Sequence, residues 1–391
     1  MTIPYGRQSI SSTDIEAVND VLRSDFLTQG PVVPKFESTL SQRCEAKFAV
    51  AVNSATSALH IACMALGVQP GDKVWTSPIT FVASANCARY CGADVEFVDI
   101  DPRTYNMSPS CLEAKLVAAQ RTGSLPKVVI PVHLSGQSCD MAAIHELAKK
   151  YSFSIIEDAS HAVGGTYRGE PVGNCRFSDI TVFSFHPVKI ITTGEGGMAL
   201  TNDKYLANSM ARLRTHGITR EVAQMQGAPT GPWYYEQLDL GYNYRLTDVA
   251  AALGISQFQR IDEFVSRRHE VAKRYNDMFA DSSVTRPWQH PDSYSAFHLY
   301  IARVDFSSHQ TTQKRVFDEL HGKGIMANLH YIPIYRQPYY QQFDYSSADF
   351  PESEKYYGEA ISLPMYPGLS VDEQSFVAQT LLRAIGESSG S

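Results

Sequence analysis

The sequence predicts an α/β protein with a large, mostly parallel central sheet sandwiched by helices, followed by a smaller C-terminal α+β domain. Short apolar runs alternate with amphipathic runs from Phe48 onward, as strands alternate with their covering helices in such folds. A long helical pattern over residues 242–279 then separates this part from a second one of different character. We therefore expect a large domain over residues 1–250 and a small domain over residues 251–391.

The strands and helices of the large domain follow one another in regular order. The predicted strands cover residues 48–52, 73–78, 95–100, 127–134 and 153–158, and the predicted helices cover residues 54–66, 80–92 and 141–151. Two more strands, at residues 179–185 and 196–202, flank a glycine-rich segment that allows a turn between them.

The second part begins with the pattern at residues 242–279, which we interpret as one connecting helix. A strand at residues 298–306, a helix at 311–324, an extended run at 325–334 and a helix near 378–385 follow it. The tail GESSGS, at residues 386–391, is predicted to be disordered.

Composition excludes several classes of function. Of the 391 residues, 43% are hydrophobic and 19% are charged, and 34 Lys plus Arg face 41 Asp plus Glu, for a net charge of -7. No basic run is interleaved with aromatic residues, so we expect no nucleic-acid partner. The start of the chain is not of signal-peptide type and no run of 18 apolar residues occurs, so we expect a cytoplasmic protein without a membrane partner.

The seven cysteines form no CxxC pair, which makes a disulfide framework improbable. Cys87 and Cys91 are four residues apart in a predicted helix and would share a face, but no second His or Cys pair completes a metal site. We expect these thiols to be small core residues, and no bound metal.

The common nucleotide and zinc-protease motifs GxGxxG, GxxxxGK[ST] and HExxH are absent. Candidate residues instead lie at strand ends, where open α/β sheets bind ligands. The segment Ser54, Ala55 and Thr56 begins a helix directly after a strand. A plain helix cap explains most such segments. The same N–H groups and hydroxyls also suit a phosphate dianion.

Asp158 ends a strand that we expect to be buried, and His161 follows three residues later. An acid at a strand end is ordinarily a cap or a turn former. A buried carboxylate that faces a heteroaromatic nitrogen would instead favour the protonated ring, because an opposite charge stabilises the cation.

Lys189 lies in VFSFHPVKIITTGEGGM, between an apolar strand and the glycines at 194, 196 and 197. Most lysines are solvated and only their alkyl stems are buried. The apolar residues on both sides of Lys189 argue for a desolvated amine that can act as a nucleophile and form a Schiff base. An anion site, a later strand-end Asp and a lysine about thirty residues beyond it together predict a pyridoxal 5'-phosphate site.

The chain resembles the sugar aminotransferases of the DegT/DnrJ/EryC1/StrS family, which have the fold of type I pyridoxal-phosphate-dependent transferases. The resemblance rests on SDFLTQG, NSATSAL, TFVASAN, EDASHAVG, FSFHPVKIITTGEGG, GYNYRLTD and HYIPIY, which span nearly the whole chain in the family order. The stretches PYGRQSI, SDFLTQGP, SFHPVKIITTGEGGM and LHYIPIYRQPYY most resemble the branch of the family that serves pseudaminic acid biosynthesis. Some relatives are dehydratases with His in place of the lysine, whereas this chain keeps Lys189.

The resemblance implies a role for each residue of the cofactor site. Lys189 would carry the cofactor and move protons, and Asp158 would pair with the ring nitrogen. The remaining implied contacts are Phe81 on the ring face, His161 at the ring oxygen, and Ala55, Thr56 and Ser184 at the phosphate, joined by Asn243 of a second subunit. The family thus implies a homodimer with shared active sites. A lone Phe such as Phe81 is otherwise more often a core residue.

The resemblance also implies substrates: a UDP-linked 4-keto-6-deoxy-N-acetyl hexose and glutamate, which leaves as 2-oxoglutarate. The implied sugar-nucleotide contacts are Tyr5, Asp25, Phe26, Leu27, Thr28, His330, Tyr331, Ile332 and Pro333. A helix end would equally explain residues 25–28, and a packed aromatic loop would equally explain residues 330–333. Three alternatives stay open: another nucleotide-linked 4-keto-6-deoxy sugar, a free amino acid, or a non-catalytic regulator that binds the cofactor or a sugar.

Overall fold

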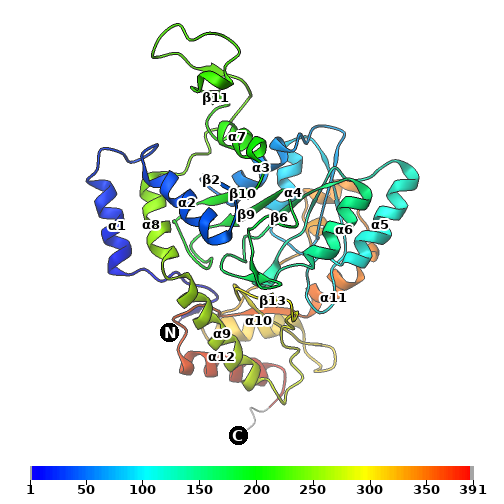
Figure 1. The fold of residues 1–391 in the computed structure, drawn as a ribbon. Coiled ribbons are helices and arrows are strands. Elements are labelled where there is room, and N and C mark those ends of the chain that lie inside the picture. The colour runs from blue at the N-terminus through cyan, green and yellow to red at the C-terminus, as the bar shows by residue number, and fades with distance from the viewer. Residues whose placement is uncertain (1, 388–391) are drawn as a thin grey trace.

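The structure, a computed structural model, describes residues 2–387 and centres on a seven-stranded sheet (Figure 1). Its strands, in spatial order, are β2 (Phe48–Val52), β10 (Gly197–Thr201), β9 (Ile180–Ser184), β6 (Ser154–Asp158), β5 (Val128–Ile130), β3 (Lys73–Thr76) and β4 (Asp94–Phe97). β10 is antiparallel to both neighbours, and the other strands share one direction. The predicted mostly parallel sheet is therefore confirmed.

Side chains of successive residues on these strands point into two different cores, because the side-chain period of a strand is two residues. Val74 and Ile156 pack with α3 (Ala55–Ala65), α4 (Ala83–Tyr90) and α7 (Lys204–Leu213) on one face. Trp75 and Ile155 pack on the other face with α5 (Pro109–Thr122) and α6 (Met141–Tyr151). Helices on both faces explain why the strands read as nearly continuous apolar runs.

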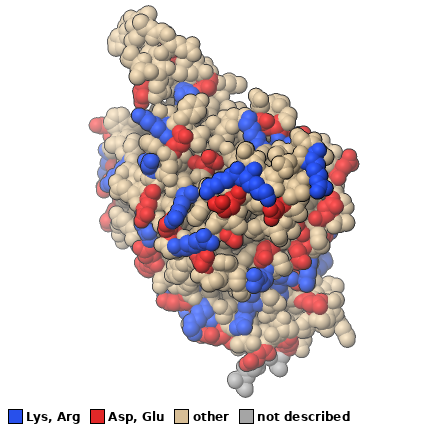
Figure 2. Space-filling view, turned by 45° about the vertical axis from the view of Figure 1, so that its right-hand side comes forward, with Lys and Arg blue, Asp and Glu red and all other residues tan. Residues whose placement is uncertain are grey.

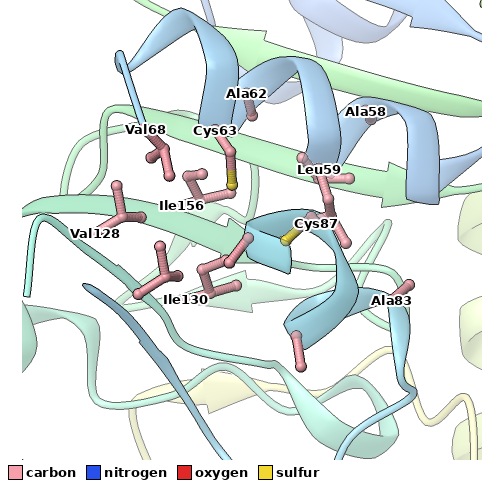
Figure 3. Packing of buried hydrophobic residues seen from close by; sticks show 14 of the residues in the cluster. Ala58, Leu59, Ala62, Cys63, Val68, Ala83, Cys87, Val128, Ile130 and Ile156 are labelled. Atoms are coloured by element: carbon pink, nitrogen blue, oxygen red, sulfur yellow. The ribbon is translucent and has the colours of Figure 1, made fainter. Parts of the chain in front are cut away.

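The cysteines contribute to this packing. Figure 3 shows Cys63 of α3 and Cys87 of α4 among the apolar side chains between the two helices and the sheet. Cys63 and Cys87 are fully buried, and Cys91 packs against the same cluster. All seven thiols are free, as the spacing predicted.

The single connecting helix predicted over residues 242–279 is wrong: the structure has two helices, α8 (Asp248–Phe258) and α9 (Ile261–Met278). Between them Arg260 leaves helical geometry at φ −106° and ψ 13°. α8 packs on α1 (Ser12–Leu22) and α2 (Val32–Cys44), whereas α9 packs on α12 (Val371–Ala384). These different partners turn the chain at a point where the sequence has neither Gly nor Pro.

A second core lies below the sheet in Figure 1. Its elements are α9, β14 (Tyr300–Arg303), α10 (Gln313–Gly322), β15 (Ile325–Met326), β16 (Ala360–Leu363), α12 and the N-terminal β1 (Ile3–Pro4). Ile3 is buried in this core, while Tyr340 and Phe350 pack back into the first one. The chain thus crosses between the two cores several times, and the division at residue 250 stays a prediction. Residues 388–391 of the predicted disordered tail lie outside the described residues.

The remaining elements are short or peripheral. They are α11 (Pro351–Glu359), a small sheet of β7 (Thr166–Tyr167), β8 (Glu170–Pro171) and β13 (Ser293–Tyr294), and the pair β11 (Ile218–Thr219) and β12 (Glu236–Gln237). Five 3-10 turns complete the described elements: Leu134–Gly136, Val222–Gln224, Ile334–Arg336, Tyr340–Phe343 and Ser347–Asp349. The segment around β11 projects from the body at the top of Figure 1. Among residues 2–387, no helix has the length and apolar character that crossing a membrane requires.

Candidate active site

A cavity of about 520 Å³ lies where β6 and β9 end, facing Tyr5, His298 and residues 328–331. Ten of the residues singled out by the sequence line it together: Tyr5, Ala55, Thr56, Phe81, Asp158, His161, Ser184, Lys189, His330 and Tyr331. Its volume falls in the range of small-molecule sites. A larger hollow of about 970 Å³ beside β4 is lined by none of the predicted residues. We therefore take the smaller cavity as the candidate site.

The N-terminus of α3 forms one wall of the cavity. Ser54 caps the helix by accepting a hydrogen bond from the N–H of Ser57 at 3.1 Å, and Ala55 and Thr56 line the cavity beside it. Gly197 of β10 lies so close that a Cβ there would be 2.5 Å from the Ala55 nitrogen. Ser184 pairs with Gly197 across the β9–β10 ladder and also lines the cavity. The wall combines helix N–H groups and hydroxyls, which suits an anion.

Asp158 lies at the end of β6 and is 5% exposed. Its Oδ2 accepts a hydrogen bond from the Ser84 hydroxyl at 2.6 Å, and its Oδ1 accepts one from the Ser160 hydroxyl at 2.6 Å. Thr80 Oγ1 lies 2.8 Å from Ser84 Oγ and continues the chain of hydroxyls. Sequence reasoning missed Ser84 and Ser160, although both lie within segments that carry the family resemblance. Donors on both oxygens hold the carboxylate in one orientation.

Lys189 lies in the loop between β9 and β10. The loop is tied down by the Phe185 carbonyl, which accepts hydrogen bonds from the Thr193 N–H at 3.0 Å and from the Thr192 hydroxyl at 3.1 Å. Burial lowers the pKa of the Lys189 amine to about 8, although the negative charge of Asp158 acts to raise it. The amine is therefore neutral in a larger fraction of molecules near neutral pH than an ordinary lysine, and a neutral amine is the nucleophilic form.

Three histidines surround Lys189. His161 Nδ1 accepts a hydrogen bond from the Ser135 N–H at 3.2 Å, so its proton belongs on Nε2, which lies 3.2 Å from the Tyr331 hydroxyl. Burial lowers the pKa of His161 well below its usual range, and the nearby Lys189 adds to the effect. Burial likewise lowers the pKa of His330 to about 3. All of these rings are thus neutral at physiological pH.

His298 is the third of these histidines and was missed by the sequence reasoning. Its Nε2 lies 3.5 Å from the Nζ of Lys189, and the ring lines the cavity. It occurs within the apolar run HLYIARVDF, which predicts a strand and carries no signal of chemistry.

The structure does not bring the other predicted residues to this cavity. Asn243 is exposed in a segment that pairs with the end of β2 at the sheet edge. Residues 25–28 are exposed on the same edge, where Thr28 pairs with Thr247 and the N–H of Asp248 donates to the Leu27 carbonyl. Ile332 is 43% exposed and Pro333 is buried, and neither lines the cavity. Within one chain, Asn243 and residues 25–28 form a separate group, and their roles stay predictions.

A mostly parallel sheet with a lysine, a strand-end aspartate and a helix N-terminus around one cavity is the arrangement of a cofactor-dependent transferase. The fold is that of the type I pyridoxal-phosphate-dependent transferases. The chain belongs to the DegT/DnrJ/EryC1/StrS aminotransferase family, whose model matches residues 8–382. It is a sugar aminotransferase.

Three relatives show the extent of the similarity. The chain is 40% identical over 382 residues to the spore coat polysaccharide biosynthesis protein SpsC of Bacillus subtilis, covering 97% of this chain and 96% of SpsC. It is 36% identical over 380 residues to the UDP-4-amino-4,6-dideoxy-N-acetyl-beta-L-altrosamine transaminase of Campylobacter jejuni, covering 97% and 96%. Helicobacter pylori PseC, an aminotransferase of pseudoaminic acid biosynthesis, superposes with a TM-score of 0.89 at 31% identity and covers 98% and 99%.

Proposed function

We propose that the protein uses pyridoxal 5'-phosphate to convert the 4-keto group of a nucleotide-linked 6-deoxy sugar into an amino group. The observation that carries the proposal is the convergence of Lys189, Asp158 and the N-terminus of α3 on one cavity. A binding protein that only recognised a sugar would need neither a desolvated amine nor a buried carboxylate at this place. This argues against the alternative of a non-catalytic regulator.

The residues present fit this cofactor. The cradle at Ala55 and Thr56 suits the phosphate. Gly197 lets the N-terminus of α3 approach β10 closely, because no side chain stands between them. The carboxylate of Asp158 is held by two hydroxyls and faces the cavity, where it suits a protonated ring nitrogen. Phe81, 57% exposed, presents its ring to the same space.

When bound, the cofactor supplies a carbonyl carbon that exchanges with amino groups and a ring that accepts the electron pair left by proton removal. Lys189 would bind the cofactor through Nζ until an amino donor displaces it. The freed Nζ would then take the proton from the donor carbon and return it on the cofactor side. In the second half-reaction Nζ would move a proton in the opposite direction, which leaves the amino group on the sugar.

The substrates that we propose are a UDP-linked 4-keto-6-deoxy-N-acetyl hexose, with pseudaminic acid biosynthesis as the pathway, and glutamate as the donor. The names of the Campylobacter and Helicobacter relatives support this choice. A second candidate is a different nucleotide-linked 4-keto-6-deoxy sugar, and it is favoured by the higher identity to SpsC, which is named for spore coat polysaccharide. Turnover measured with a panel of UDP-linked and dTDP-linked 4-keto sugars separates the two, because only the correct base and sugar fit should give high kcat/KM.

We also propose that the active unit is a homodimer, at work in the cytoplasm. Asn243 and residues 25–28 lie together on an exposed edge of the sheet. In a two-fold dimer, this edge would lie against the cavity of the second copy and complete it. The arm around β11 and β12 exposes Val222, Trp233, Tyr235 and Leu240, with fractional exposures between 50% and 77%. Figure 2 shows this projection at the top with few charged side chains. Such an exposed apolar projection is suited to burial against another protein surface.

The test of the proposed function is chemical labelling. Reduction of the cofactor-loaded protein with borohydride should fix the cofactor on the peptide that contains Lys189, as read by mass spectrometry. Lys189→Ala should retain noncovalent binding of pyridoxamine phosphate and lose turnover. A label on another lysine, or normal turnover in Lys189→Ala, would contradict the proposal.

A further inference from the structure

His298 is a buried imidazole whose only side-chain hydrogen-bond contact within residues 2–387 is with Lys189. It is 3% exposed, its Nε2 faces Nζ at 3.5 Å, and its Nδ1 finds no hydrogen-bond partner within residues 2–387. An unpaired buried polar atom lowers stability, whereas an apolar side chain of similar shape avoids this cost. A purely structural explanation for this histidine is therefore weak.

The backbone holds the ring in place. The buried Arg268 of α9 donates from Nη1 to the carbonyls of Phe297 at 3.2 Å, His298 at 3.1 Å and Met365 at 3.1 Å. The ring of His161 packs against that of His298 with a centroid distance of 4.3 Å. The imidazole is therefore fixed from its backbone and from one ring face, as a group that positions another group must be.

The charges around His298 keep it neutral. The groups that face it are His161, Lys189, Arg268 and His330, and they come from four different segments. Burial is the main cause that holds the pKa of His298 well below its usual range, and all four neighbours act in the same direction. A neutral imidazole has one nitrogen with a lone pair and one with a proton. Nε2 can thus accept a hydrogen bond from a charged Lys189, or donate one to a neutral Lys189 in the other tautomer.

We propose that His298 is a positioning residue that holds the side-chain amine of Lys189, through a hydrogen bond between Nε2 and Nζ, while that amine transfers protons. The inference rests on the proposed function. A distance of 3.5 Å is at the long end for a hydrogen bond, and catalytic contacts often shorten when ligands bind. A misplacement of about 1 Å at such a centre can lower a rate by about 100-fold.

The first experiment uses the cofactor-free protein. Lys189 is labelled with a trace of acetic anhydride between pH 6 and pH 10, and its titration midpoint is read from the labelled peptide. We expect His298→Leu to lower the midpoint by about one pH unit, because the charged amine loses an acceptor. His269→Leu is the matched control: this histidine packs on Tyr294 and contacts the Ser295 carbonyl at 2.7 Å, so the Lys189 midpoint should not change.

A conservative pair of variants guards against misfolding of His298→Leu. The amide of Gln reaches the position of Nε2, whereas the shorter Asn reaches only the position of Nδ1. His298→Gln should keep the Lys189 midpoint near its native value, and His298→Asn should lower it as His298→Leu does. In the loaded enzyme, His298→Asn should lower kcat by about 10- to 100-fold with little change in KM. It should also raise the isotope effect with an amino donor deuterated at the reacting carbon, because proton transfer becomes slower.

Equal midpoints in the Asn and Gln variants, or an unchanged isotope effect in His298→Asn, would overturn the inference. Failure of the proposed function is distinguishable from this outcome. In that case borohydride would mark a residue other than Lys189 in the native protein. The midpoint in the cofactor-free protein reads the contact of His298 with Lys189 independently of that result.

Discussion

At the scale of single residues, the cavity contains groups whose usual charge states are disfavoured by burial. The negative charge of Asp158 offsets only part of the cost of burying a charged Lys189 amine. The histidines around the amine are neutral and offer no negative charge. Groups that serve chemistry in this way are often held at a cost in stability.

The cost at Lys189 is predicted to depend on pH. The pKa is about 8 in the folded protein and 10.5 for an ordinary lysine, so the unfolded chain binds more protons between these values. Stability of the cofactor-free protein should therefore rise with pH across that window. Lys189→Met removes the buried charge and should raise the free energy of unfolding by about 1–3 kcal/mol at pH 7.

Urea unfolding of the cofactor-free proteins at pH 7 and pH 9.5 measures this effect. The advantage of Lys189→Met should shrink at the higher pH. Lys149→Met, at an exposed position paired with Glu146, is the control and should change stability by no more than about 0.5 kcal/mol at either pH. A Met variant less stable than the native protein at pH 7 would show that Lys189 is not desolvated.

Asp158→Asn is predicted to separate catalysis from folding. The variant keeps the shape and leaves Ser84 and Ser160 with a hydrogen-bonding partner, but removes the charge that stabilises a protonated ring. A carboxylate within about 4–6 Å of a ring nitrogen shifts the pKa of that nitrogen by about 1–3 units. Turnover in Asp158→Asn should therefore fall about 10- to 1000-fold. Turnover and thermal unfolding are measured side by side. Near-native turnover would indicate that Asp158 is only a strand-end cap.

At the scale of elements, the proposed phosphate cradle depends on the contact between β10 and α3. A Cβ on Gly197 would be 2.5 Å from the Ala55 nitrogen and 2.6 Å from the Ser54 oxygen, both backbone atoms that cannot move aside alone. The glycine is therefore required for the close approach of strand and helix.

Gly197→Ala should displace the first turn of α3. We expect a loss of about 1–3 kcal/mol in stability and weaker binding of the cofactor, measured by urea unfolding and by cofactor titration. The control is Gly358→Ala in α11, where a Cβ meets nothing within 4 Å. This change should stabilise the protein by about 0.5–1 kcal/mol and leave cofactor affinity unchanged. Native cofactor affinity in Gly197→Ala would refute the role of the contact.

At the scale of the whole molecule, the predicted site residues other than Ile332 and Pro333 fall into two spatial groups. Ten surround the cavity, whereas Asn243 and residues 25–28 lie on a separate exposed edge, tied together by the Thr28–Thr247 bridge. Two such groups on one chain suit a two-fold dimer in which each copy completes the other's site.

Mixed dimers test this arrangement. Lys189→Ala and Asn243→Asp subunits should each be inactive or strongly impaired alone, the latter because its negative charge repels a phosphate. After subunit exchange, each mixed dimer would hold one site with both residues intact, so activity should recover to about a quarter of the native value. Size-exclusion chromatography and tagged subunits verify the exchange. No recovery after verified exchange, or an active monomer, would refute the shared site.

The sequence by itself determined the alternation of strands and helices, the mostly parallel sheet and ten of the residues that line the cavity. Those features depend on local periodicity and on motifs such as the one around Lys189, which are written in consecutive residues. It did not determine the break at Arg260, because that break follows from the different packing partners of α8 and α9. It also did not reveal His298 or Ser84, since their roles follow from contacts at sequence separations of 109 and 74 residues. Only the tertiary structure decides such contacts, because burial and proximity between distant segments arise when the sheet and the second core pack together.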